Sequence, residues 1–135
     1  MKRIIALMAV AILALVATHG HADVHHIKAA LESAPGSSVT GSVNLVQMPH
    51  GGTNIVVVAS GLEPGGTYSS FYYESSDCTE PADLFKTVTA RSDGTVTIQG
   101  KIDDDLDEVG SVSIRLGEGY GTLLACADVH GGEKE

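Results

Sequence analysis

Short runs of β-favouring residues follow one another along this chain, and Gly, Pro, Asn or Asp closes nearly every run. After residue 22 the apolar residues show almost no helical period. Such a pattern is typical of antiparallel strands that pack as two layers around one core. We therefore expect an all-β domain, an eight-stranded antiparallel β-sandwich or flattened barrel. The expected strands are 26–31, 39–47, 54–60, 67–74, 84–91, 95–102, 111–116 and 122–129.

The alternation within these runs predicts which side chains enter the core. Val43 and Leu45 share one face of their strand, and Val96 and Ile98 share one face of theirs, so both pairs are expected inside. The apolar run Ile55 to Ala59 is continuous, which predicts a strand buried on both faces.

The first 22 residues resemble a cleaved secretory signal peptide. A basic start is followed by the apolar run Ile4 to Val16, which is too short for a stable membrane span, and Gly20 and Ala22 fit the small-x-small cleavage rule. We expect a mature domain of residues 23–135 in the periplasm or outside the cell, with no membrane contact after cleavage. The alternative is an anchor that stays uncut.

The charge of the chain excludes one class of partner. The formal net charge is −9 at pH 7, and no cluster of Lys and Arg is present. Proteins that bind nucleic acid neutralise phosphates with such clusters, so we expect no nucleic-acid partner.

Cys78 and Cys126 are the two cysteines of the chain. Two cysteines in a small exported domain usually form a disulfide. The alternatives are two free thiols or half of a metal site.

Five segments, in this order, resemble the Cu,Zn superoxide dismutase family. They are the strand VTGSVNLVQ at 39–47, the Gly-Leu-Glu-Pro-Gly turn at 61–65, Asp77-Cys78, Asp83-Leu84, and Gly-Thr-Leu-Leu-Ala-Cys at 121–126. The resemblance covers nearly all of the predicted mature domain. It implies a Greek-key sandwich and places both cysteines at the positions of the family disulfide.

The residues that the resemblance aligns with the copper ligands are not histidines. The family motif Phe-His-Val-His-Glu aligns with Ser70 to Glu74, so Phe71 and Tyr73 replace its two histidines. A later copper histidine falls near Arg115, which does not ligate metals, and Leu123 replaces the active-site arginine.

The zinc ligands of the family are also missing. The long loop that carries them is reduced to Thr79 to Ala82. Asp83 matches the zinc carboxylate and Glu74 matches the glutamate of the copper strand, and Glu80 stands near a zinc histidine position. Carboxylates without imidazole or thiolate make a poor zinc site.

A separate metal hypothesis concerns the predicted mature N-terminus. Asp23-Val24-His25 would offer an amine, two amide nitrogens and an imidazole, a square-planar set that suits Cu(II) or Ni(II), and His26 adds a donor. Chance placement of early histidines, or cleavage elsewhere, is the alternative.

Phe71 and Tyr73 lie two residues apart and share one face of their strand. They predict either an exposed patch for a protein partner or a second subunit, or an aromatic pair covered by neighbouring turns.

The first functional hypothesis is a non-catalytic, superoxide dismutase-like binding or structural module without a cofactor, and not an enzyme. The second is a copper-handling protein that binds Cu(II) through residues 23–26. The third is an active dismutase with unusual ligands.

Overall fold

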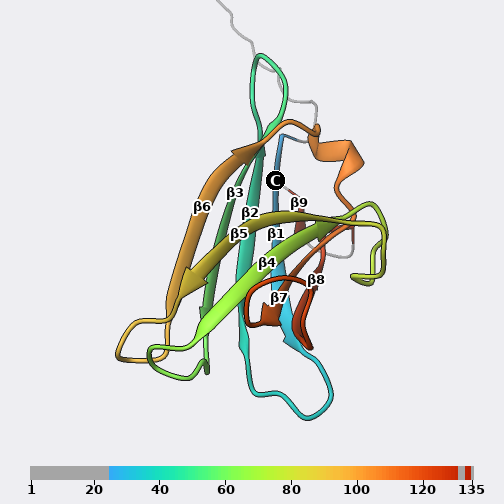
Figure 1. The fold of residues 1–135 in the computed structure, drawn as a ribbon. Helices are drawn as coiled ribbons and strands as arrows, with labels where there is room; N and C mark the ends of the chain where they lie inside the picture. Colours follow the sequence, from blue (N-terminus) through green and yellow to red (C-terminus); the bar gives the residue numbers. More distant parts are fainter. Residues whose placement is uncertain (1–24, 131–132, 135) are drawn as a thin grey trace, which may run out of the picture.

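The computed structural model describes residues 25–130 and 133–134 (Figure 1). The predicted signal peptide, and Asp23 and Val24 of the copper hypothesis, lie outside the described residues. Strands and loops dominate the described part, where a single 3-10 turn is the one helical element. Among these residues, no helix is long and apolar enough to cross a membrane. The elements are β1 (His26–Ser33), β2 (Thr40–Gln47), β3 (Thr53–Ser60), β4 (Thr67–Tyr73), β5 (Ala82–Thr89), β6 (Val96–Ile102), η1 (Leu106–Glu108), β7 (Ser111–Leu116), β8 (Leu123–Asp128) and β9 (Glu133–Lys134).

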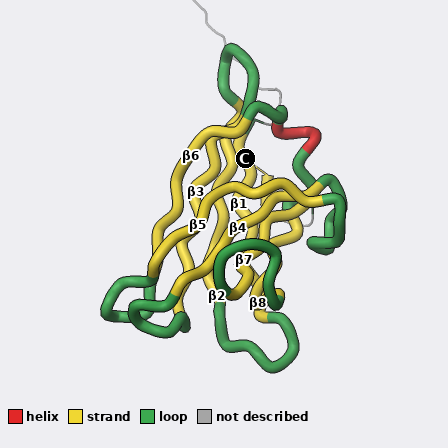
Figure 2. Tube along the Cα trace, viewed as in Figure 1, coloured by secondary structure: helices red, strands yellow, loops and turns green. Residues whose placement is uncertain are grey.

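The strands form one antiparallel sheet that curls into a nearly closed barrel. The order is β5-β4-β7-β8-β1-β2-β3-β6, and the short β9 pairs with β1. In Figure 1, β4 and β5 cross in front of β1, β2 and β3, and Figure 2 shows loops gathered at the two ends of the barrel. The end strands meet where Gly100 of β6 lies against Phe85 and Lys86 of β5. The all-β prediction is therefore confirmed.

The strand order is that of a Greek key. β4, β5 and β6 follow one another around the barrel, and β7 returns to pair with β4. This arrangement matches the spatial order four-one-two-three that defines the motif. Because β7 returns to the middle of the sheet, residues 111–116 lie directly beside residues 68–73.

The barrel interior is apolar and follows the predicted alternation. Val43 and Leu45 of β2 are fully buried, and Val96 and Ile98 of β6 are buried as expected. The expectation for β3 was wrong, because Ile55 and Val57 are fully buried but the Val58 side chain is 43% exposed. The outer face of β3 meets solvent, as one face of an antiparallel sheet commonly does.

β4 is the strand buried on both faces. Its Tyr68 and Tyr72 pack against the main core, whereas Phe71 and Tyr73 form a second cluster with Cys78. Since successive side chains of a strand point to opposite faces, this second cluster lies outside the barrel wall. The loops on that side must therefore supply its cover.

The acidic run 103–108 closes one end of the barrel. Leu106, within η1, is buried, and its backbone N–H donates to the side-chain oxygen of Gln47 at 2.7 Å. The Asp105 carboxylate accepts from the Gly52 N–H at 2.8 Å and from the Gln47 amide at 3.1 Å. These bonds fix the loop across residues that lie more than fifty positions apart in the sequence.

Candidate functional site

The candidate site is the second cluster on the outer face of β4, built around Phe71 and Tyr73. Their side chains are 7% and 1% exposed, so neither forms a surface patch. The Tyr120 ring meets Phe71 edge-on, with ring centroids 5.0 Å apart and an interplanar angle of 88°. It also lies 6.4 Å from the Tyr73 ring. In the structure the pair is covered by a neighbouring turn and is not an exposed patch, while a partner at this face stays a prediction.

The cover comes from the tight turn that joins β7 to β8. Gly117 and Gly119 both have φ near +80°, a conformation that costs glycine little and other residues more. Backbone bonds from Gly117 N–H to Thr67 O, and from Leu116 N–H to Thr122 O, fix the base of the turn. This geometry carries Tyr120 over the aromatic pair while its own side chain stays 40% exposed.

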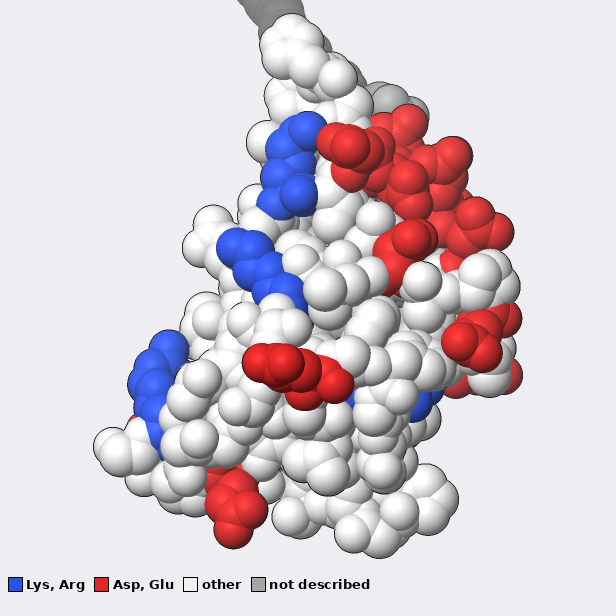
Figure 3. Space-filling model, in the orientation of Figure 1, with Lys and Arg blue, Asp and Glu red and all other residues white. Residues whose placement is uncertain are grey.

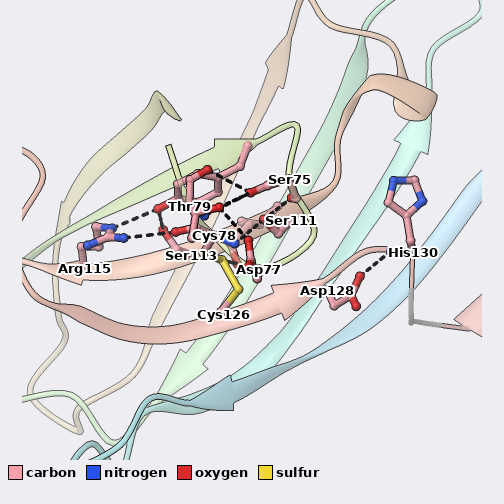
Figure 4. Close-up of a disulfide and its surroundings, with 12 residues drawn as sticks. Ser75, Asp77, Cys78, Thr79, Ser111, Ser113, Arg115, Cys126, Asp128 and His130 are labelled. Atoms are coloured by element: carbon pink, nitrogen blue, oxygen red, sulfur yellow. Dashed lines mark hydrogen bonds between the residues drawn. A yellow bond between two sulfur atoms is a disulfide. The ribbon is translucent and has the colours of Figure 1, made fainter. Parts of the chain in front are cut away.

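Arg115 of β7 connects the segments around the cluster. Its Nε donates to the Tyr73 hydroxyl at 2.9 Å, and its terminal nitrogens donate to Gly121 O at 2.8 Å, Tyr120 Oη at 2.9 Å and Cys78 O at 3.3 Å. The guanidinium carbon also lies 3.7 Å from the centroid of the Tyr120 ring, a cation–π geometry. One side chain therefore joins β4, the disulfide loop and the β7–β8 turn. Figure 4 shows Arg115 beside Cys78 and the disulfide.

Buried hydroxyls complete this network. The Tyr73 hydroxyl lies 2.7 Å from Ser113 Oγ. Because Arg115 can only donate, the phenol hydrogen of Tyr73 is free to bond to Ser113. Such satisfied networks specify one arrangement of the groups that form them.

The phenol of Tyr120 is held in its neutral form. Burial raises its pKa to about 12, and the adjacent Tyr73 side chain adds to the shift. A neutral phenol is a hydrogen-bonding group and not an anionic metal ligand at neutral pH. The contacts of its ring with Phe71 and Tyr73 are what make it a cover over the cluster.

The predicted disulfide is confirmed, and both alternatives for the cysteines were wrong. Cys78 and Cys126 are joined, with their Cα atoms 6.1 Å apart, and neither cysteine is free. The backbone of Cys78 has φ of +61°, and its N–H donates to Ser111 Oγ at 2.9 Å. Ser111 Oγ in turn donates to Ser75 O at 2.7 Å, so β7 anchors the whole disulfide loop.

The acidic residues singled out by the resemblance are not part of the Phe71 and Tyr73 cluster. Glu74 and Asp83 are exposed, and Figure 3 shows acidic side chains gathered on that side of the molecule. We call the set Glu74, Asp83, Asp103, Asp104 and Glu108 the acidic edge. Desolvation, followed by repulsion from the other four members, raises the pKa of the Asp104 carboxyl. In the described part of the chain, no three His, Cys, Asp or Glu side chains are grouped so that they could hold a metal ion.

The two described histidines of the copper hypothesis are separated. The His26 ring nitrogen lies 3.2 Å from Asn44 Oδ1 on the neighbouring strand. His25 instead lines a pocket of 360 Å³ at the barrel end, together with His130 and Asp107. The structure therefore places His25 and His130 on the same pocket, which the sequence did not predict.

The network of Arg115, Tyr120 and Ser113 was also missed. In the sequence, Arg115 was considered only as a residue near a lost copper ligand. A tyrosine flanked by glycines in a tight turn, five residues after an arginine, was the local signal.

No protein-family model matches the chain, and no curated protein matches it. The resemblance to the Cu,Zn superoxide dismutase family therefore stays a prediction.

Proposed function

We propose that this protein is an exported, non-catalytic module with a superoxide dismutase-like fold, which acts by binding or as a structural part. The observation that carries the proposal is the set of contacts that Phe71, Tyr73 and Arg115 make within the protein. At the three positions that the resemblance aligns with copper ligands, Phe71 and Tyr73 pack in one cluster and Arg115 donates to the Tyr73 hydroxyl. A metal ion in their place would have to displace the Tyr120 ring and the guanidinium.

Electrostatics support the same conclusion. The donors of Arg115 already bond to protein oxygens, and Leu123 stands where the family arginine would attract an anion. The formal net charge of −9 repels superoxide at long range. The proposal is therefore supported by residues that lack imidazole ligands at the aligned copper positions and lack a free guanidinium to attract an anion.

Superoxide turnover tests the proposal. The full chain, supplied with copper and zinc and then dialysed against a chelator, should show no more activity than buffer treated in the same way. Turnover that survives dialysis would instead support an active dismutase with unusual ligands. The variant Phe71→His/Tyr73→His should also stay inactive, because Arg115 and the short loop at 79–82 remain.

A second candidate function is copper handling through the N-terminus. The observation that favours it is that His25, which would supply the imidazole of the proposed set, lines the same pocket as His130 and Asp107. A chain that begins at Asp23 should bind one Cu(II) in a nitrogen-rich square-planar site, and binding should weaken as pH falls because the amine and amides must lose protons.

Variants separate the contributions to that binding. One extra residue before Asp23, or His25→Ala, should abolish the square-planar visible band. His50→Ala serves as the control, since His50 is an exposed histidine in the β2–β3 turn and does not line the pocket that His25 lines. A normal band in His25→Ala would place the copper elsewhere and refute this candidate.

A further inference from the structure

A groove of 770 Å³ runs beside the disulfide, between β1 and β8. The two strands pair only at Glu32 with Cys126 and at Ser33 with Ala125. Along the rest of β1 toward Lys28, β8 is not paired with it, and the groove opens there. Cys126 lines this groove, whereas Cys78 does not.

The two halves of the disulfide therefore differ in access. Cys78 is 2% exposed, and its sulfur lies 3.5 Å from Val112 O beneath its own loop. Its backbone is held on both sides by Ser111 and Arg115. Cys126 is only partly buried. An external nucleophile that enters the groove meets Cys126 first.

We propose that this groove is a thiol-exchange site, at which a small aminothiol opens the disulfide selectively at Cys126. The thiolate of the incoming molecule forms a bond to Cys126 Sγ, and the bond between the two cysteine sulfurs breaks. Its electron pair leaves with Cys78 Sγ, which becomes a thiolate and takes up a proton. The products are a mixed disulfide at Cys126 and a free Cys78 thiol, and no other oxidant or reductant is needed.

The charges along the groove determine which thiols it accepts. Glu32, Asp77 and Asp128 line it, and Lys28 is the cation among its lining residues. An excess of carboxylates lowers the local concentration of an anionic thiol and raises that of a thiol carrying an ammonium group. This is why the proposal specifies an aminothiol.

Exchange at this site also releases the outer-face cluster. The Cys78 loop supplies the carbonyl that accepts from Arg115, and Cys78 itself packs with Phe71 and Tyr73. Once Cys78 is released, the loop loses its covalent link to β8 and keeps its hydrogen bonds with Ser111 and Arg115. The groove thus controls the cover of the cluster on the opposite side of the disulfide.

The direct test is peptide mapping after limited exchange. The mature protein, expected to be residues 23–135, is treated briefly with cysteamine. The reaction is quenched with acid, and the protein is then alkylated and digested. The proposal expects cysteamine on Cys126 and the alkyl group on Cys78, with the reverse product at least roughly tenfold rarer because reactivity follows access. Equal labelling, or cysteamine mainly on Cys78, would overturn it. The same reaction in guanidinium chloride should label both cysteines equally.

A second measurement tests the role of charge. Cysteamine should react faster than mercaptopropionate when rates are compared per thiolate, and added salt should reduce the difference. Asp77→Asn/Asp128→Asn should reduce it as well, while Glu63→Gln, in an exposed turn outside the groove, should not. If the two thiols react equally with the unaltered chain at low salt, the aminothiol assignment is wrong.

Discussion

The interior of the barrel and the outer face of β4 are both buried, but different interactions hold them together. The interior is formed by alternating aliphatic side chains such as Val43, Leu45 and Val57. The outer face combines Phe71 and Tyr73 with buried serines, an arginine and a disulfide. Hydrophobic burial is non-directional, whereas the outer face depends on specific hydrogen bonds and one covalent bond.

This difference shows how a surface of the barrel can be closed without long loops. Two short segments, 74–81 and 117–122, cover the aromatic pair because Arg115 and the disulfide fix their positions. The interior should therefore tolerate loss of these links better than the cover does. The following four changes test that contrast.

Removal of the disulfide should have the largest effect. In the chain-entropy model, closing a loop whose ends are 48 residues apart stabilises the fold by about 4 kcal/mol, so Cys126→Ser should lower the free energy of unfolding by a similar amount. Urea titration measures it. Reduced wild-type protein is the control and should match the variant. An unchanged unfolding midpoint on reduction would contradict the assigned role of the disulfide.

The interior is tested by a matched pair of valines on β3. Val57 is fully buried and Val58 is 43% exposed. Val57→Ala should lower the free energy of unfolding by about 2 kcal/mol through lost burial and the cavity left behind. Val58→Ala should change it by less than about 0.5 kcal/mol. Equal effects in denaturant titrations would show that β3 is buried on both faces after all.

Arg115→Met tests the network on the outer face. It removes donors to four oxygens and should lower the free energy of unfolding by about 2 kcal/mol, because the Tyr120 cover and the Cys78 carbonyl lose their bonds. Arg91→Met is the control, since the exposed Arg91 guanidinium bonds to the hydroxyl of Thr95. If the two variants lose stability equally, Arg115 does not hold the cover.

The smallest effect is expected at the acidic edge. The raised pKa of Asp104 means that the folded state binds its proton more tightly than the unfolded state, so this carboxyl destabilises the fold as pH rises above 3.8, through its folded pKa. Asp104→Asn should therefore raise stability at pH 7 by less than about 1 kcal/mol and leave it unchanged at pH 3.

Asp105→Asn is the contrasting variant in the same loop. The Gly52 N–H lowers the pKa of the Asp105 carboxyl, so this group contributes stability above 3.8 that is lost as pH falls through its folded pKa. Replacing it should lower the melting temperature at pH 7. A gain in stability from both variants would show that general charge repulsion dominates the loop.

Much of the fold could be predicted because strand alternation and turn residues are local signals. The eight predicted strands are present, and each altered strand end is shifted by one or two residues. Leu106 was missed because its burial depends on Gln47, far away in the sequence. The Arg115 and Tyr73 bond was missed for the same reason, since the two residues lie 42 positions apart. Val58 was wrongly predicted to be buried because a continuous aliphatic run does not reveal whether the outer face of its strand is covered.

The most direct test of the central claim is the melting temperature with and without added zinc and copper. A ligand that binds only the folded state raises the melting temperature, by an amount that grows with its concentration and affinity. The chain is prepared with one extra residue before Asp23, so that the proposed N-terminal copper set is disabled. If Arg115, Tyr73 and Tyr120 occupy the outer face of β4 in place of metal, neither ion should raise the melting temperature. An increase that disappears in Tyr73→Phe would place a metal ion in the cluster and contradict the account.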